Sequence, residues 1–171
     1  MARWAKGERA VQYLLDNARL ESIEAENLGD LAQALIARAT LRVDTTATAA
    51  LAGGDVDGAY VAAYDAYRMA AESLLAQQGL RATGGDGSHM TVEDAVCTQF
   101  VTQIPAFAKP TFERFRRTRH SAQYFDPKSA PITKADASWA IEKATDALSG
   151  VRALLADSPP GQFVTGPEDQ A

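Results

Sequence analysis

Apolar residues in this chain recur at three- and four-residue steps over long stretches, and no stretch shows the alternation of a convincing strand. The clearest example joins Tyr60, Tyr64, Tyr67, Ala71 and Leu74, which would form one stripe along a helix. Helices with such stripes bury them against one another through short connections, so no sheet is needed. The sequence therefore predicts an all-α protein, an up-and-down helical bundle of about five helices.

Turn and capping residues divide the chain into these helices. Paired glycines at 53–54 should end one long helix, and Gly79 should cap the end of the next. Candidate caps at the helix starts are Asn27, Asp55 or Asp57, Thr91 with Asp94, and Thr133 or Asp136. The resulting helices are expected over residues 4–19, 28–51, 55–78, 91–104, 110–125 and 133–155.

A chain of 171 residues fits one domain with an ordinary core. We expect an N-terminal accessory helix within 1–27, the bundle over 28–157, and a disordered tail over 158–171, where three prolines and two acids follow one another closely. No stretch approaches the roughly 20 apolar residues of a membrane span, and the N-terminus has no signal-peptide core. These features predict a cytoplasmic protein without a membrane partner.

Metal and disulfide chemistry are not predicted. Cys97 is the only cysteine and should be a small buried hydrophobe, while His89 and His120 are the only histidines. No ligand spacing completes a zinc site from these three residues, so we expect neither a metal nor a cofactor. His89, in a loop with three glycines, is expected to be solvated.

The feature most informative about function is the run from Phe112 to Tyr124. It places four arginines, a histidine and a tyrosine in about three helical turns, although the whole protein has a net charge of -5. Like charges repel at helical spacing, so this reversal of sign predicts a bound anion, and phosphate points to RNA or a nucleotide. The acidic background predicts a focused contact rather than indiscriminate coating of nucleic acid.

On a helix, Arg116, His120 and Tyr124 lie along one face with Arg119 beside them, while Phe112 and Phe115 would be buried. Guanidinium groups bind phosphate through paired hydrogen bonds, and an imidazole could take the proton of a ribose 2′-hydroxyl. This is the minimum set of groups for metal-independent RNA cleavage. The alternative is an arginine-rich face that is solvated or paired with acids of another helix.

Two blocks of the sequence resemble the HEPN domain family, the higher-eukaryote and prokaryote nucleotide-binding domains. Residues 116–127, followed by the helix expected over 133–155, resemble the signature end of the family, and residues 58–85 look like its preceding helix and loop. The resemblance covers about residues 28–156. In the family's hallmark, a histidine follows an arginine and its polar neighbour; here Arg119 and His120 match the first two positions and Tyr124 replaces the final histidine. A second register, starting at Arg114, would end on His120.

The resemblance implies a HEPN-like bundle that forms a homodimer with the two motif helices facing each other. Active HEPN proteins are metal-independent endoribonucleases of toxin–antitoxin and phage-defence systems, and others only bind RNA or nucleotides. By resemblance, Arg119, His120 and Tyr124 would form the catalytic site, and Arg114, Arg116 and Arg117 would bind RNA phosphates. An unperturbed phenol is a poor base at neutral pH, so the exchange at Tyr124 leaves ribonuclease and binding protein both open.

A third interpretation is a catalytically inactive helical module. In that case the arginine face would dock an acidic protein partner, such as a cognate antitoxin or nucleotidyltransferase.

Overall fold

The computed structural model describes residues 6–24, 26–85, 87–123, 128 and 130–163. Within these residues the chain forms an all-α bundle with one short two-stranded ribbon, which confirms the predicted fold class. The α-helices are α1 Glu8–Asp16, α2 Leu28–Leu41, α3 Thr48–Ala52, α4 Val56–Gln77, α5 Ser88–Phe100, α6 Lys109–Gln123 and α7 Lys134–Asp157. The strands are β1 Leu20–Ser22 and β2 Leu80–Ala82.

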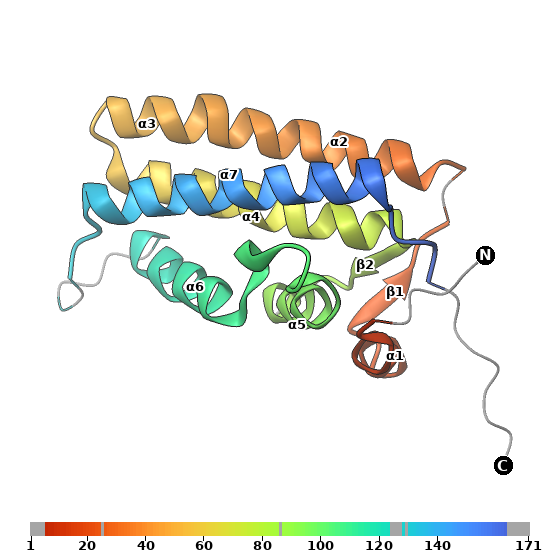
Figure 1. Cartoon of the computed structure of the whole chain (residues 1–171). Helices are drawn as coiled ribbons and strands as arrows, with labels where there is room; N and C mark the ends of the chain where they lie inside the picture. The colour runs from red at the N-terminus through yellow and green to blue at the C-terminus, as the bar shows by residue number, and fades with distance from the viewer. Residues whose placement is uncertain (1–5, 25, 86, 124–127, 129, 164–171) are drawn as a thin grey trace, which may run out of the picture.

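Helix α4 is the centre of the bundle and contacts α2, α5, α6 and α7 (Figure 1). Helices α2 and α3 lie along one side of the α4–α7 pair, and α5 and α6 cover the other side (Figure 1). Helix α1 packs against α5 at the outside of the bundle. None of the helices in the described part of the chain is long and apolar enough to cross a membrane.

Side-chain caps mark the starts of α2, α4 and α7. Asn27 and Asp55 accept hydrogen bonds from the backbone N–H groups three residues later, as expected for caps of α2 and α4. Thr133 and Asp136 form a reciprocal capping box at the start of α7. Gly79 follows α4 with φ +75°, a conformation that favours glycine, so the expected end of this helix is also confirmed.

Three elements differ from expectation. The ribbon was not predicted, because its three-residue strands pair Leu20 with Ala82 across a long stretch of chain and are too short to show alternation. The expected helix over 28–51 contains a π-helical stretch, Arg42–Ala47, that separates α2 from α3. Helix α5 begins at Ser88, after Gly87 with φ +88°, so Thr91 lies inside the helix and is not its cap.

The core is built on aromatic rings from α4 and α6. The predicted tyrosine stripe is part of this core, since Tyr60, Tyr64 and Tyr67 are all at most 3% exposed. The Phe115 ring, which is fully buried, lies 4.5 Å from the Tyr67 ring and 4.9 Å from the Trp139 ring of α7, measured between centroids. These contacts fix α6 against both α4 and α7.

The chain beyond α7 returns to the bundle. The backbone N–H of Phe163 donates a hydrogen bond of 2.9 Å to the carbonyl of Gln78, and the Phe163 side chain is buried. Within the expected tail, Pro160 and Phe163 are therefore packed in the structure, while Ser158 and Pro159 are exposed. The rest of it, 164–171, lies outside the described residues.

Candidate functional site

Helix α6 carries the arginine run, and its two phenylalanines decide how the run is oriented. Pro110 lies in the first turn, where a missing N–H has no effect on helical hydrogen bonding. Phe112 and Phe115 are three residues apart and both buried, so they hold one face of α6 on the core. The arginines are consequently directed along the neighbouring helices or into solvent.

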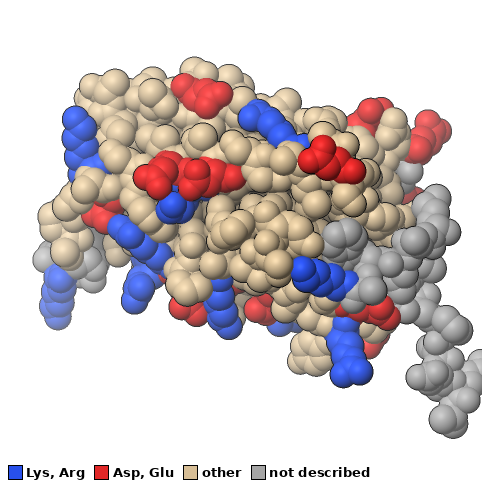
Figure 2. All heavy atoms as spheres, viewed as in Figure 1, with Lys and Arg blue, Asp and Glu red and all other residues tan. Residues whose placement is uncertain are grey.

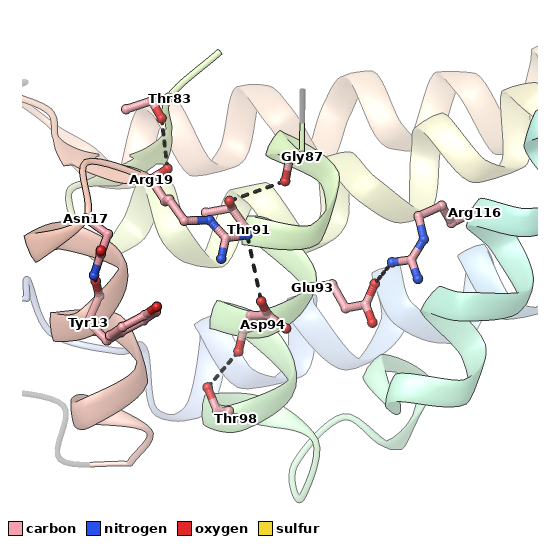
Figure 3. A network of polar contacts seen from close by, with 10 residues as sticks. All are labelled: Tyr13, Asn17, Arg19, Thr83, Gly87, Thr91, Glu93, Asp94, Thr98 and Arg116. Carbon is pink, nitrogen blue, oxygen red and sulfur yellow. Dashed lines mark hydrogen bonds and ion pairs between the residues drawn. The ribbon is translucent and has the colours of Figure 1, made fainter. Parts of the chain in front are cut away.

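Two of the predicted phosphate ligands are paired with acids of other helices. The Arg116 Nη1 atom lies 2.5 Å from Oε2 of Glu93, a residue of α5 whose side chain is only 5% exposed (Figure 3). The Arg114 Nη2 atom lies 3.1 Å from Oδ1 of Asp136 on α7, and the Arg114 guanidinium stacks 3.8 Å over the Trp139 ring. For Arg114 and Arg116, the structure thus shows the acid-paired arrangement that the sequence left as an alternative.

The surroundings of Arg119 differ from those of Arg114 and Arg116. Its guanidinium carbon lies 5.1 Å from the centroid of the Tyr64 ring, and no carboxylate of the described chain is at ion-pair distance from it. Its Nε atom is buried and has no hydrogen-bond partner among the described residues. A buried donor without a partner is destabilising, so packing alone gives no reason for this arrangement. Arg119 is therefore the best candidate on α6 for an external anion.

A second group of polar residues lies beside Arg119. Tyr64 and Arg68, four residues apart on α4, both contact His89 on α5: the Tyr64 hydroxyl lies 2.8 Å from His89 Nδ1 and Arg68 Nη1 lies 3.1 Å from the same atom. Arg68 Nη1 also lies 3.4 Å from His89 Nε2, and because arginine can only donate, one of the two ring nitrogens accepts from Arg68. We call Tyr64, Arg68, His89 and Arg119 the polar cluster.

Burial and the nearby charges explain the state of His89. Burial lowers the pKa of His89, and the cations Arg68, Arg119 and Arg116 lower this pKa further, while Asp65 opposes them. The neutral imidazole expected at pH 7 agrees with the hydrogen bonds it makes. Burial also raises the pKa of the Tyr64 phenol, so this hydroxyl keeps its proton.

No family model matches this chain, and no curated protein and no solved structure matches it either. The resemblance to HEPN domains accordingly rests on the two sequence blocks quoted above. No group of three or more histidine, cysteine or carboxylate side chains that could hold a metal ion is found in the described part of the chain.

Of the three predicted catalytic residues, the structure places one in the polar cluster. Arg119 belongs to it, His120 is exposed, and Tyr124 lies outside the described residues. Arg117, predicted to bind RNA phosphates, is also exposed, and no ion pair to it is found within the described ranges.

His89 is the residue that sequence reasoning missed. It is half-buried in the first turn of α5 rather than solvated in a loop. A signal was present: His89 and Glu93 are four residues apart, as are Tyr64 and Arg68, so each pair shares a helix face. The sequence could not show that these two faces meet.

Basic and acidic residues are distributed unevenly around the site. Figure 2 shows Lys and Arg side chains mainly along the lower part of this face, over α1, α5 and α6, with acidic side chains between them. The close view of α5 shows two such pairs, Arg116 with Glu93 and Arg19 with Asp94 (Figure 3). The surface is therefore one of alternating charge, and Arg119 differs from the exposed Arg117 in having a buried Nε without a hydrogen-bond partner in the described chain.

Proposed function

We propose that this protein binds phosphate groups of RNA or of a nucleotide at Arg119, in the manner of a HEPN-type protein. The observation that carries the proposal is the buried Nε of Arg119, a member of the polar cluster, which has no partner within the described chain. A phosphate that drew the guanidinium out of its buried position would supply an acceptor for it, and charge-assisted hydrogen bonds of this kind are about twice as strong as neutral ones. Arg117 and His120, both exposed on α6, would add donors from the solvent side.

The proposal includes metal-independent RNA cleavage in toxin–antitoxin or phage-defence systems, with a homodimer as the working form. One structural feature bears on cleavage: the imidazole of His89, whose pKa is lowered, lies near Arg119, and it would become a proton acceptor for RNA on release of its contact with Arg68. Binding without cleavage is the simpler form of the same proposal, and one incubation with RNA in EDTA distinguishes the two. Docking of an acidic protein remains the alternative.

Arg119→Ala is expected to weaken binding of a short RNA about tenfold, because one phosphate contact would be lost. The measurement is fluorescence anisotropy of a labelled oligonucleotide at low salt with EDTA present. The slope of log affinity against log salt should also fall by about one unit. Cleavage, if the wild-type protein shows it, should decrease in the same variant.

Arg152→Ala is the matched control. Arg152 is an exposed arginine of α7 that hydrogen-bonds to Thr40 of α2, on the other side of the bundle from α6. The two variants lose the same charge, so equal RNA affinities for them would show that Arg119 has no special role. Capture of an acidic protein that is lost in Arg119→Ala, without any RNA affinity, would instead support the docking alternative.

The affinity for RNA is expected to rise as the pH falls from about 8 to about 5. A phosphate at Arg119 would offset the cationic charge that lowers the pKa of His89, so the bound form would hold a proton on His89 at a higher pH than the free form. More protons in the complex than in the free protein mean tighter binding at lower pH. A 2′-O-methylated oligonucleotide avoids cleavage, and its phosphodiesters do not titrate in this range.

His89→Gln should flatten this pH profile while leaving the affinity at pH 8 nearly unchanged, because glutamine is neutral at every pH. A profile that is equally steep in His89→Gln would assign the pH dependence to another group.

A further inference from the structure

A cavity of about 520 Å³ lies at the end of the bundle where α2, α4 and the β1–β2 ribbon come together. Leucines from three elements form much of its wall: Leu31 and Leu35 of α2, Leu75 of α4 and Leu80 of β2. Leu31 is 39% exposed, so it leaves apolar surface beside the cavity available to a ligand. The volume is typical of a small-molecule site.

One wall of the cavity is polar. Arg68 and Glu72 line it from α4, with Arg68 Nε 3.2 Å from Glu72 Oε1. The Nε atom of Arg68 is buried and, despite this short distance, does not have hydrogen-bond geometry to any acceptor in the described structure. Burial raises the pKa of Glu72, although Arg68 opposes the effect. A donor and an acceptor thus lie side by side at one edge of the leucine wall, and Glu24 and Arg81 add charged side chains elsewhere in the lining.

Arg68 belongs to both the cavity and the polar cluster. While its Nε faces Glu72 in the cavity, its Nη1 contacts His89, and His89 directly follows Ser88, which also lines the cavity. A ligand that enters the cavity and reaches Arg68 would therefore end close to the phosphate site proposed at Arg119. The ligand should have an apolar body and an edge that offers both an acceptor and a donor.

We propose that this cavity binds the base of a nucleotide whose phosphate is held at Arg119. The inference rests on the proposed function, because the phosphate site supplies the reason for a nucleotide rather than another planar compound. The faces of the base would contact the leucines, and its edge would accept from Arg68 and donate to Glu72. Arginine and carboxylate side chains pair with base edges in this way in nucleic-acid recognition.

The test compares the four ribonucleoside 5′-monophosphates with ribose 5-phosphate, which has no base, by isothermal titration calorimetry on the full chain. At least one nucleotide is expected to bind about tenfold or more tightly than ribose 5-phosphate, the gain expected from burying one ring system. Leu35→Trp, which adds bulk at a half-buried cavity position, should remove this gain and leave ribose 5-phosphate affinity unchanged. Equal affinity of all five compounds, or a gain that persists in Leu35→Trp, would overturn the proposal.

Glu72→Gln provides a second variant of nearly identical shape. It should reduce the ratio of the affinity for the tightest-binding nucleotide to that for ribose 5-phosphate at least threefold, because an amide is a weaker acceptor than a carboxylate. The affinity for ribose 5-phosphate itself should not change. An unchanged gain in a folded Glu72→Gln protein would remove the polar edge from the proposal.

Arg119→Ala separates this inference from the proposed function. It should lower the affinities for ribose 5-phosphate and for the nucleotides by the same factor. The ratio between these affinities, which measures the contribution of the base, should stay the same. If Arg119→Ala changes the affinity neither for ribose 5-phosphate nor for the nucleotides, Arg119 is not the phosphate site. A preference for nucleotides over ribose 5-phosphate that is lost in Leu35→Trp would still place a base in the cavity.

Discussion

Phe115→Ala is expected to lower the free energy of unfolding by about 3–5 kcal/mol, the range for removing a buried aromatic ring from a core. The Phe115 side chain is fully buried, and its ring touches Tyr60, Tyr64, Tyr67 and Trp139. Alanine would leave a void between three helices that are each held by other contacts, so the void could close only in part. Chemical denaturation followed by circular dichroism measures the effect.

Leu41→Ala is the control for this prediction. It also shortens a large apolar side chain, but Leu41 is 62% exposed and its removal should change stability by less than about 0.5 kcal/mol. If Phe115→Ala lowers the free energy of unfolding by as little as Leu41→Ala does, the Phe115 ring does not fix α6 to the core.

The role of Phe115 also connects stability to the site. It is four residues from Arg119 on α6, and the same ring contacts Tyr64, over which the Arg119 guanidinium lies. A loosened α6 would displace Arg119 from the polar cluster. RNA binding by Phe115→Ala should therefore be weakened even at temperatures where most of the protein remains folded.

Features of the fold that depend on a few neighbouring residues could be predicted from the sequence. The side chain of Asp55 caps α4 by accepting from the N–H of Gly58, and Thr133 with Asp136 forms the capping box of α7; both arrangements involve residues three apart. The burial of Phe112 and Phe115 followed in the same way from helical spacing. Such signals are local, so packing elsewhere does not change them.

The features that could not be predicted join distant segments. The β1–β2 ribbon pairs Glu21 with Arg81, and three-residue strands are too short for a periodic pattern to be visible. The acids that pair with Arg114 and Arg116 come from α7 and α5, and nothing in the arginine run indicates which helices will lie beside it. His89 joined the candidate site for the same reason: its partners are on α4.

Arg116→Ala is expected to lower the free energy of unfolding by about 2–3 kcal/mol at pH 7, because it would leave the buried carboxylate of Glu93 without its ion pair. Removing one partner of a fully buried pair costs more, but Arg116 is itself 41% exposed, so solvent screens part of the loss. Arg117→Ala on the same helix removes an exposed arginine and should change stability by less than about 0.5 kcal/mol.

The pH dependence of this loss has a definite sign. Burial raises the pKa of Glu93 in the folded protein and Arg116 lowers it, so the pKa should rise further when Arg116 is removed. When the pKa of a carboxyl group is higher in the folded than in the unfolded state, its ionisation destabilises the fold at high pH. This destabilisation disappears as the pH falls below the pKa of the unfolded state, about 4.3. The deficit of Arg116→Ala should therefore be largest near neutral pH and shrink toward pH 4.

A double variant, Arg116→Ala with Glu93→Gln, separates the structural role of Arg116 from a role in phosphate binding. Glutamine needs no countercharge, so the double variant should regain most of the stability lost in the single variant. If Arg116 serves Glu93, the stable double variant should bind RNA within about twofold of the wild-type affinity, a difference below the value of a single phosphate contact. A tenfold loss of RNA affinity in a fully stable double variant would instead place Arg116 at the phosphate, beside Arg119, with Glu93 holding it in position.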